Sequence, residues 1–237
     1  MLKYKKGEWD MVLLGSFVNG AAVLLCGILG ALIKSKLSKR ICDTVMHGMA
    51  LCIILIGISG ALSGENTVIT IVSMAIGALI GEGVNIDKHV NRFGAFLQSK
   101  LVKDSESSFG EGFVTASLLI CVGAWAITGA MDAGIRGEHS SFYAKAVVDA
   151  VACLIMATTL GIGVALSGIV LFLYQGSLAL LSTFIAPYLT ETVVNELTCV
   201  GSLLIVAIGL NMMGLTKIKV VNLLPAVFVA AIITKII

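Results

Sequence analysis

The sequence predicts an all-α membrane protein whose chain crosses the bilayer about eight times (7–8 transmembrane helices). Hydrophobic residues make up 58% of the 237 residues and charged residues only 13%, whereas a soluble domain carries about 25% charged residues. The mean hydropathy is +1.03. A helix needs about 20 apolar residues to cross the hydrocarbon core of a bilayer. Apolar segments of about this length lie at residues 11–33, 44–62, 67–84, 112–131, 146–166, 168–188, 193–214 and 219–235.

The least distinct boundary in this series lies between the fifth and sixth segments. Only Ser167 and Gly168 separate them. Seven spans, or one broken helix at this point, are therefore the alternative to eight.

Residues 85–110 are too polar to cross the membrane and are expected to form an amphipathic linker helix. Such a helix lies in the headgroup layer, with apolar side chains on one face and basic side chains around the rest. The apolar face comprises Ile86, Val90, Phe93, Leu97 and Leu101, and the basic residues are Lys88, Arg92, Lys100 and Lys103. An ordinary solvated linker helix is the alternative.

Basic residues also predict the orientation of the chain. They gather in the loop after the first span, in the linker and in the loop before the last span. Because positively charged loops stay on the cytoplasmic side, the linker is expected in the cytoplasm and the N-terminus outside. Lys3, Lys5 and Lys6 in the N-terminal tail favour the opposite orientation.

An eight-residue stretch occurs twice, as GISGALSG at residues 57–64 and as GIGVALSG at residues 161–168. Phe17-Val18 and Phe113-Val114 open the first and fourth spans in the same way. These matches predict that residues 11–84 and 111–188 are distant three-helix repeats, followed by a two-helix segment at 193–237. The second copy begins three spans after the first, and because three is an odd number it would cross the membrane in the opposite direction. Such inverted repeats are typical of secondary transporters. Chance recurrence of small residues in packed membrane helices is the alternative.

Several function classes are not expected from this sequence. The net charge of +2 is too small to suggest a nucleic-acid partner. The six cysteines lie in or beside apolar segments without metal-ligand spacing, so they are interpreted as packing residues. The motifs GxSxG, HExxH and GxxxxGK[ST] are missing from the sequence. Neither an enzyme nor an ATP-driven pump is therefore expected, and no cofactor or metal is implied.

Isolated polar residues inside apolar segments are the candidates for a substrate or ion site. A buried polar side chain must find hydrogen-bond partners, because an unpaired one is costly in lipid. The Tyr-Gln-Gly-Ser run in the sixth segment is the clearest interruption of an apolar stretch, and Gly176 within it could let the helix unwind. Interhelical hydrogen bonds are the alternative role. The candidates are Tyr174, Gln175 and Ser177, with Asn19 in the first span and Thr115 and Ser117 in the fourth.

Three carboxylates near the ends of spans are candidates for coupling transport to protons or other ions. Ionisable groups inside a bilayer are costly and are functional hypotheses by default. The candidates are Glu82, Glu111 and Asp149, and interfacial carboxylates in contact with water are the alternative. Asp43 and Glu196 are interpreted as helix-start acids favoured by the helix dipole. His47 lies one turn after Asp43, and a structural pair between them is expected rather than a proton relay.

The chain resembles the YqgA/YdfK-like family of bacterial inner-membrane proteins. The resemblance rests on FVTASLLICVGAWAITGA (113–130), SSFYAKAVVDA (140–150), IGALIGE (76–82) and GLNMMGLTKIKVVNLLPA (209–226), and on the shorter stretches TLGIGV and LYQGS. It covers nearly the whole chain from Met11, which is an alternative start to Met1. The resemblance implies a multi-span protein of the bacterial cytoplasmic (inner) membrane with a suspected transport role. It brings no substrate and no catalytic residues.

Together these observations predict a secondary transporter or facilitator for a small polar solute or ion, coupled to a proton or sodium gradient. The site would lie at the interface between the two repeats. A non-transporting partner or sensor subunit is the main alternative, and a passive channel is a further one. A stripe of small residues at Ser73, Gly77 and Gly81 is typical of helix packing, either within one chain or in a homodimer.

Overall fold

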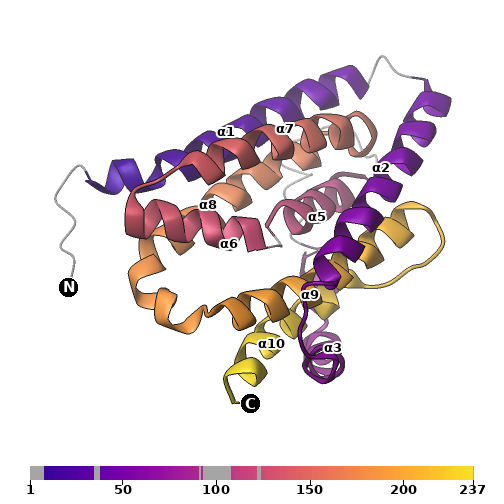
Figure 1. Cartoon of the computed structure of the whole chain (residues 1–237). Coiled ribbons are helices and arrows are strands. Elements are labelled where there is room, and N and C mark those ends of the chain that lie inside the picture. Colours follow the sequence, from indigo (N-terminus) through magenta and orange to yellow (C-terminus); the bar gives the residue numbers. More distant parts are fainter. Residues whose placement is uncertain (1–7, 35–37, 91, 93–107, 122–123, 237) are drawn as a thin grey trace.

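The computed structural model describes residues 8–34, 38–90, 92, 108–121 and 124–236, and these residues form helices and turns but no strand (Figure 1). The all-helical fold is therefore confirmed. Three short turns of other helical geometry join the helices: a π-helical turn, η1 (Asp132–Arg136), and two 3-10 turns, η2 (Ala186–Tyr188) and η3 (Val220–Leu223). The α-helices are α1 (Glu8–Lys34), α2 (Lys39–Ala61), α3 (Thr67–Val84), α5 (Ser108–Cys121), α6 (Ala124–Met131), α7 (Ser140–Leu160), α8 (Gly163–Ile185), α9 (Glu191–Met212) and α10 (Pro225–Ile236).

Six continuous helices of the described chain are long and apolar enough to cross a membrane: Val12–Lys34, Asp43–Ala61, Thr67–Val84, Ser140–Leu160, Gly163–Tyr188 and Glu191–Met212. The segment predicted at 112–131 is not one of them. It is divided into α5 and α6, which diverge by 74° and count as a seventh span only if both halves belong to one broken helix.

The segment predicted at 219–235 also falls short of a full span. It begins with the turn η3, and Pro225 starts α10, as suits a residue that has no backbone N–H to donate. The 12 residues of α10 measure about 18 Å at a rise of about 1.5 Å per residue, less than the hydrocarbon thickness of about 30 Å. Eight continuous spans are therefore not found among the described residues.

The break between the fifth and sixth segments lies earlier than predicted. Helix α7 ends at Leu160, and Gly161 follows with a φ of 79°. Glycine adopts a positive φ without the penalty that a Cβ brings, so it suits this position directly after the helix end. Ser167 and Gly168 lie inside α8.

This boundary also separates the structural settings of the two octamers. Residues 57–61 form the end of α2, whereas residues 163–168 form the start of α8. The two stretches are thus not equivalent in the structure, and the repeat that they predicted, 11–84 with 111–188, has no support from their placement. Both stretches are rich in small residues, which suits helix packing in either setting.

The predicted linker at 85–110 falls largely outside the described residues. Asn85 ends α3 with a φ of 55°, and residues 86–90 are helical again. Ile86 and Val90 are partly buried, while Lys88 is exposed, as an amphipathic helix requires. Phe93, Leu97, Leu101, Lys100 and Lys103 lie outside the described residues.

Helices from the two ends of the chain pack against each other. The most extensive contacts pair α1 with α7 and α8, and α2 with α9. Helix α3 packs mainly on α10, so α1–α3 pack mainly on later helices and not on one another. Figure 1 shows α1, α7 and α8 side by side, with α9 and α10 in a separate group near α3. Of the six candidate spans, α9 is the most buried and α2 and α3 are the least.

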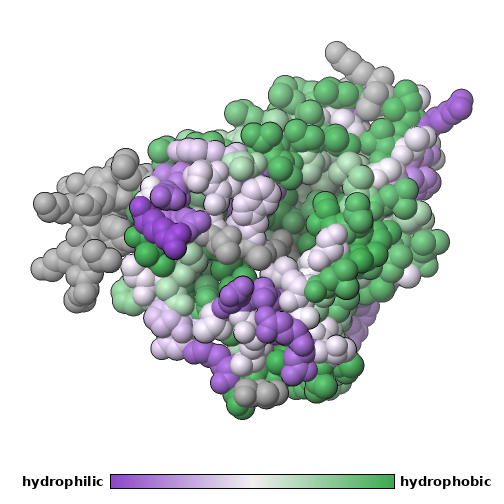
Figure 2. All heavy atoms as spheres, viewed as in Figure 1, coloured by the Kyte–Doolittle hydropathy of each residue, from purple (hydrophilic) through white to green (hydrophobic). Residues whose placement is uncertain are grey.

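The outer surface is broadly apolar. Figure 2 shows hydrophobic residues over large areas of one face, with hydrophilic residues gathered in separate patches. Large apolar side chains of α2 and α3 are exposed, among them Leu51, Leu55, Val68 and Leu79. Such a surface is expected for helices that face lipid.

Candidate functional site

A buried polar network lies where α1, α7 and α8 pack together. It comprises Asn19 of α1, Lys145 and Asp149 of α7, and Gln175 of α8. Asn19, Asp149 and Gln175 each lie near the middle of a helix. The network is therefore near mid-depth in three candidate membrane spans.

Close packing of α1 on α8 brings the network together. A Cβ atom on Gly20 would lie 2.8 Å from the carbonyl oxygen of Gly168, and a Cβ atom on Gly168 would lie 2.5 Å from the carbonyl oxygen of Gly20. Only residues without a side chain allow two helix backbones to approach this closely. Asn19, directly before Gly20, is thereby held against α8.

Hydrogen bonds link all four side chains. The Asn19 Nδ2 group donates to Asp149 Oδ2 and to Gln175 Oε1, each at 3.1 Å. Lys145 Nζ lies 2.8 Å from the carboxylate oxygens of Asp149, one helical turn away on α7. The ion pair is nearly completely buried, and Asn19 and Gln175 are fully buried. The network therefore carries one positive and one negative charge and no net charge.

Two polar atoms of this network have no partner within the described protein. They are the acceptor Asn19 Oδ1 and the donor Gln175 Nε2. A buried polar group without a hydrogen bond is destabilising by about 1–3 kcal/mol. The network therefore leaves one acceptor and one donor without a hydrogen bond to the described residues.

The sequence-predicted site residues divide into two groups. Asn19, Gln175 and Asp149 meet in the network, as candidates chosen separately from three different segments. Thr115 is buried on α5 and the Ser117 Oγ atom has no partner, but neither is hydrogen-bonded to the network. Ser177 is exposed, and its hydroxyl donates to the Leu173 carbonyl oxygen of its own helix. Tyr174 lines a separate cavity, described below.

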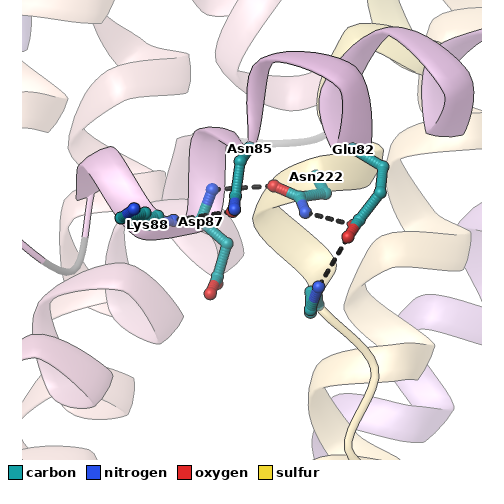
Figure 3. Close-up of polar contacts among 6 residues, drawn as sticks. Glu82, Asn85, Asp87, Lys88 and Asn222 are labelled. Carbon is teal, nitrogen blue, oxygen red and sulfur yellow. Dashed lines mark hydrogen bonds and ion pairs between the residues drawn. The ribbon is translucent and has the colours of Figure 1, made fainter.

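Glu82 lies at the end of α3 in a different, exposed cluster (Figure 3). Its carboxylate accepts hydrogen bonds from Lys219 Nζ and Asn222 Nδ2, both at 2.6 Å. Asn222 Oδ1 in turn accepts from the backbone N–H of Asp87 at 2.7 Å. The hydrogen bond to the Glu82 carboxylate raises the pKa of Lys219 above its ordinary value. The cluster fastens the end of α3 to η3 and lies outside the buried network.

The remaining candidate acids occupy exposed positions. Glu111 is exposed in the first turn of α5, and Asp43 and His47 are exposed near the start of α2. No hydrogen bond or ion pair between Asp43 and His47 is found in the described structure.

Two buried charged residues were not recognised as such from the sequence. The predicted span 146–166 leaves Lys145 in the preceding loop, although its spacing of four residues from Asp149 places both on one helix face. Glu196 was interpreted as a helix-start acid but is completely buried. Its Oε1 atom accepts hydrogen bonds from the backbone N–H groups of Glu65 and Asn66, both at 2.8 Å, and its Oε2 atom has no partner among the described residues.

Replacing Glu196 with alanine is expected to lower the free energy of unfolding by at least about 2 kcal/mol, because hydrogen bonds to a charged acceptor contribute about 1.5–3 kcal/mol each. The backbone N–H groups before α3 would lose their acceptor. Thermal unfolding of the detergent-solubilised protein measures the change. Glu191→Ala, an exposed acid on the same helix, is the control and should change stability little; equal losses would contradict the anchoring role.

A cavity of about 520 Å³ lies among α5, α6, α8, η2, α9 and α10. Its walls are mainly apolar and include Leu118, Leu178, Leu197 and Val227. Small-molecule sites commonly measure about 300–1,000 Å³. In the described part of the chain, no group of three or more His, Cys, Asp or Glu side chains could hold a metal ion.

Comparison with known proteins identifies relatives along nearly the whole chain. Residues 14–235 match the model of a family described as "Protein of unknown function (DUF554)". The uncharacterized membrane protein YdfK of Bacillus subtilis (strain 168) is 30% identical over 224 residues, which cover 92% of this chain and 94% of YdfK. The uncharacterized protein YqgA of Escherichia coli (strain K12) is 34% identical over 223 residues, covering 92% and 95% of the two chains. No solved structure matches.

Proposed function

The chain belongs to the DUF554 family of proteins of unknown function, and we propose that it is a secondary transporter or facilitator for a small solute, coupled to an ion gradient. The observation that carries this proposal is the buried Lys145–Asp149 ion pair near mid-depth in apolar helices. Ionisable groups at such depth are costly and mark substrate or ion pathways and proton relays. Asp149 is the residue assigned to ion coupling, while Glu82 and Glu111, being exposed, are less suited to it.

An inverted repeat would allow alternating access, and the one proposed here relates different helices from those that the octamers predicted. We infer that α1–α3 correspond to α8–α10. All three helix pairs pack antiparallel: α1 from Ser16 through Gly27 meets α8 from Gly176 back to Ala165. In the pair of α2 and α9, Gly60 contacts Ser202 and the earlier residue Ile54 contacts the later residue Gly209. In the pair of α3 and α10, Gly77 contacts Ala226, and Gly81 contacts Asn222 in the turn η3 before α10.

The contacts between α1 and α8 are reciprocal, as a twofold axis requires. Gly20 corresponds to Gly168 and Leu24 to Phe172, each 148 residues further along the chain. A Cβ atom on Gly20 would lie 2.8 Å from the Phe172 Cβ atom, and one on Gly168 would lie 3.2 Å from the Leu24 Cβ atom. A twofold axis in the membrane plane turns each helix onto an antiparallel partner in this way, which is the symmetry of many transporters.

The same shift aligns the other two helix pairs. It carries Asp43-Thr44-Val45 at the start of the second span onto Glu191-Thr192-Val193 at the start of α9. The shift of 148 residues also carries Gly77 of α3 onto Pro225 of α10. Pro225 directly precedes Ala226, which is the residue that Gly77 contacts. The polar network lies beside the Gly20–Gly168 contact and hence near the proposed axis.

The alternative of a non-transporting partner subunit predicts that every central polar group is satisfied by neighbouring helices and that no cavity remains. The unpartnered atoms of Asn19 and Gln175 and the 520 Å³ cavity favour the transporter. We retain the proposal that the protein is not an enzyme, because the charged groups of the network are paired with each other and the sequence contains no GxSxG, HExxH or GxxxxGK[ST] motif.

Gln175→Ala is expected to abolish most solute-driven ion movement in proteoliposomes, measured with a pH-sensitive dye in the lumen against pools of metabolites and ions. Its effect on stability should be small, about 0.6 kcal/mol for an average interhelical hydrogen bond in a membrane. Leu173→Ala, an exposed position on the same helix, is the control and should retain activity. A Gln175→Ala protein with full activity would remove the network from the pathway.

A further inference from the structure

A lysine lies at the rim of the apolar cavity. Tyr188 of η2 and Phe228 of α10 line the cavity and are 59% and 71% exposed, whereas Leu118 and Thr198 in its walls are buried. The cavity therefore extends from the surface of the protein into the helix bundle. The Lys235 Nζ atom lies over the Tyr188 ring, 3.7 Å from the ring centroid. This contact places a cation at the exposed end of the cavity.

Helical spacing places the same lysine on the face of α10 that lines the cavity. Val227 and Ala231 line it four residues apart, and Lys235 follows Ala231 by four more residues in the same helix. Residues four apart lie on one side of a helix, so this face continues from the cavity wall to the ammonium. At a rise of about 1.5 Å per residue, Lys235 lies about 6 Å beyond Ala231 along the helix axis.

The rim lies at the edge of the membrane-spanning region. Tyr188 is the last residue of the candidate span Gly163–Tyr188, and the next candidate span begins at Glu191. Tyrosine and lysine suit this depth, because the apolar part of each side chain can lie in hydrocarbon while the polar tip reaches the head groups. Lys235 is exposed and has no carboxylate partner among the described residues. Its ammonium is therefore accessible to an anionic head group.

The body of the cavity suits a hydrocarbon chain better than water. Its walls are apolar apart from Tyr174, Cys121 and Thr198, and apolar cavities of this kind stay dry. An empty cavity would deprive the side chains that line it of van der Waals contacts. Because the exposed rim lies at the edge of the membrane-spanning region, the acyl chains of the bilayer are the nearest molecules of matching chemistry.

The lysine, and not the acyl chain, decides which lipid is preferred. An acyl chain that leaves the bilayer for an apolar cavity remains in apolar surroundings, so the transfer itself contributes little. A lipid phosphate that accepts a charge-assisted hydrogen bond from an ammonium is bound more strongly. A zwitterionic lipid carries its own ammonium beside the phosphate, whereas an anionic lipid offers an uncompensated negative charge that attracts lysine.

We propose that the cavity binds one acyl chain of an anionic phospholipid, whose phosphate is held by Lys235 beside the Tyr188 ring. Binding is reversible and changes no covalent bond. The inference depends on the membrane setting of the chain and not on the proposed transport function. The lipid site is separate from the buried polar network of α1, α7 and α8.

Native mass spectrometry of the full chain in a mild detergent tests this inference. The protein is titrated separately with palmitoyl-oleoyl phosphatidylglycerol and with palmitoyl-oleoyl phosphatidylcholine. These two lipids have the same acyl chains and differ in the net charge of the head group. One molecule of phosphatidylglycerol should bind about fivefold more tightly than phosphatidylcholine, as expected for one lysine beside an anionic lipid.

Lys235→Gln removes the charge at the rim and should lower the affinity for phosphatidylglycerol to that for phosphatidylcholine. Lys235 is exposed, so this variant should fold normally, and its thermal unfolding should match that of the unchanged protein. Lys217→Gln is the matched control, because Lys217 is also exposed but precedes η3 at the other end of α10. It should keep the fivefold preference.

Ala231→Phe tests the cavity independently of the lysine. Ala231 lines the cavity, so a phenylalanine there would occupy the space of the acyl chain and should weaken binding of phosphatidylglycerol at least fivefold. Ile232→Phe, at the next position but 59% exposed, should bind normally. Equal affinities for the two lipids in the unchanged protein, an undiminished preference in Lys235→Gln, or normal binding by Ala231→Phe would each overturn the proposal.

Discussion

Replacing Lys145 with methionine is expected to lower the free energy of unfolding by about 3–5 kcal/mol, because it leaves the buried Asp149 carboxylate without a counter-charge. Asp149→Leu should have a similar effect by leaving the ammonium unpaired. The double variant Lys145→Met/Asp149→Leu should recover most of the loss, since an apolar pair of similar volume is often as stable as a buried ion pair. Thermal unfolding of the four purified proteins in one detergent measures the cycle.

The chain contains a matched control for this cycle. Arg136 and Asp132 form an ion pair with the same four-residue spacing, 3.1 Å apart, but the Arg136 side chain is 69% exposed. Exposed pairs contribute only about 0–1 kcal/mol, so Arg136→Met should change stability little. A double variant as unstable as either single variant would contradict the description of Lys145 and Asp149 as mutually compensating charges.

Gly81→Ala is expected to reduce the free energy of unfolding by about 1–3 kcal/mol or more, the range for overpacking of a tight core. A Cβ atom on Gly81 would collide with the carbonyl oxygen of Asn222, and it would lie 2.6 Å from the carbonyl carbon of that residue. These are backbone atoms, which cannot move aside as a flexible side chain would. Helix α3 would have to separate from η3, which would also disturb the Glu82–Asn222 hydrogen bond.

Gly83→Ala is the control, two residues further along the same helix. A Cβ atom on Gly83 would have no atom within 4 Å, so alanine should be neutral there or stabilise the helix by up to about 1 kcal/mol. Both variants can be compared by thermal unfolding in one detergent. Equal stability of the two would show that α3 and η3 are not in close backbone contact, and would weaken the inferred pairing of α3 with α10.

The membrane setting and most of the helices were predictable because the signals that define them are local. A run of about 20 apolar residues has no other stable place than a bilayer or a large core, and within lipid it must satisfy its backbone hydrogen bonds as a helix. Helices α2, α3 and α9 therefore lie close to their predicted positions. The length of the apolar segment 219–235 did not reveal that α10 is short. The turn η3 takes up the start of this segment, and η3 packs on α3 through Asn222, a contact that the sequence does not show.

Part of the candidate site was predictable for a related reason. Asn19 and Gln175 stand out as single polar residues in apolar stretches, and the structure places them 3.1 Å apart. The sequence shows that such residues need partners but not which ones, since that depends on the face each helix turns inward. Lys145 turns inward and Ser177 outward, although by sequence the first was assigned to a loop and the second to the site.

By itself, then, the sequence determined that this chain is a helical membrane protein with a few buried polar residues. Composition and the length of an apolar run are local properties, which can be read without knowing which segments pack together. The tertiary structure alone decided the rest. The approach of Gly20 to Gly168 joins three distant polar residues into one network. Burial of α9 encloses Glu196, and α1–α3 pack antiparallel on α8–α10. These outcomes depend on contacts between residues more than 100 positions apart, which no local pattern encodes.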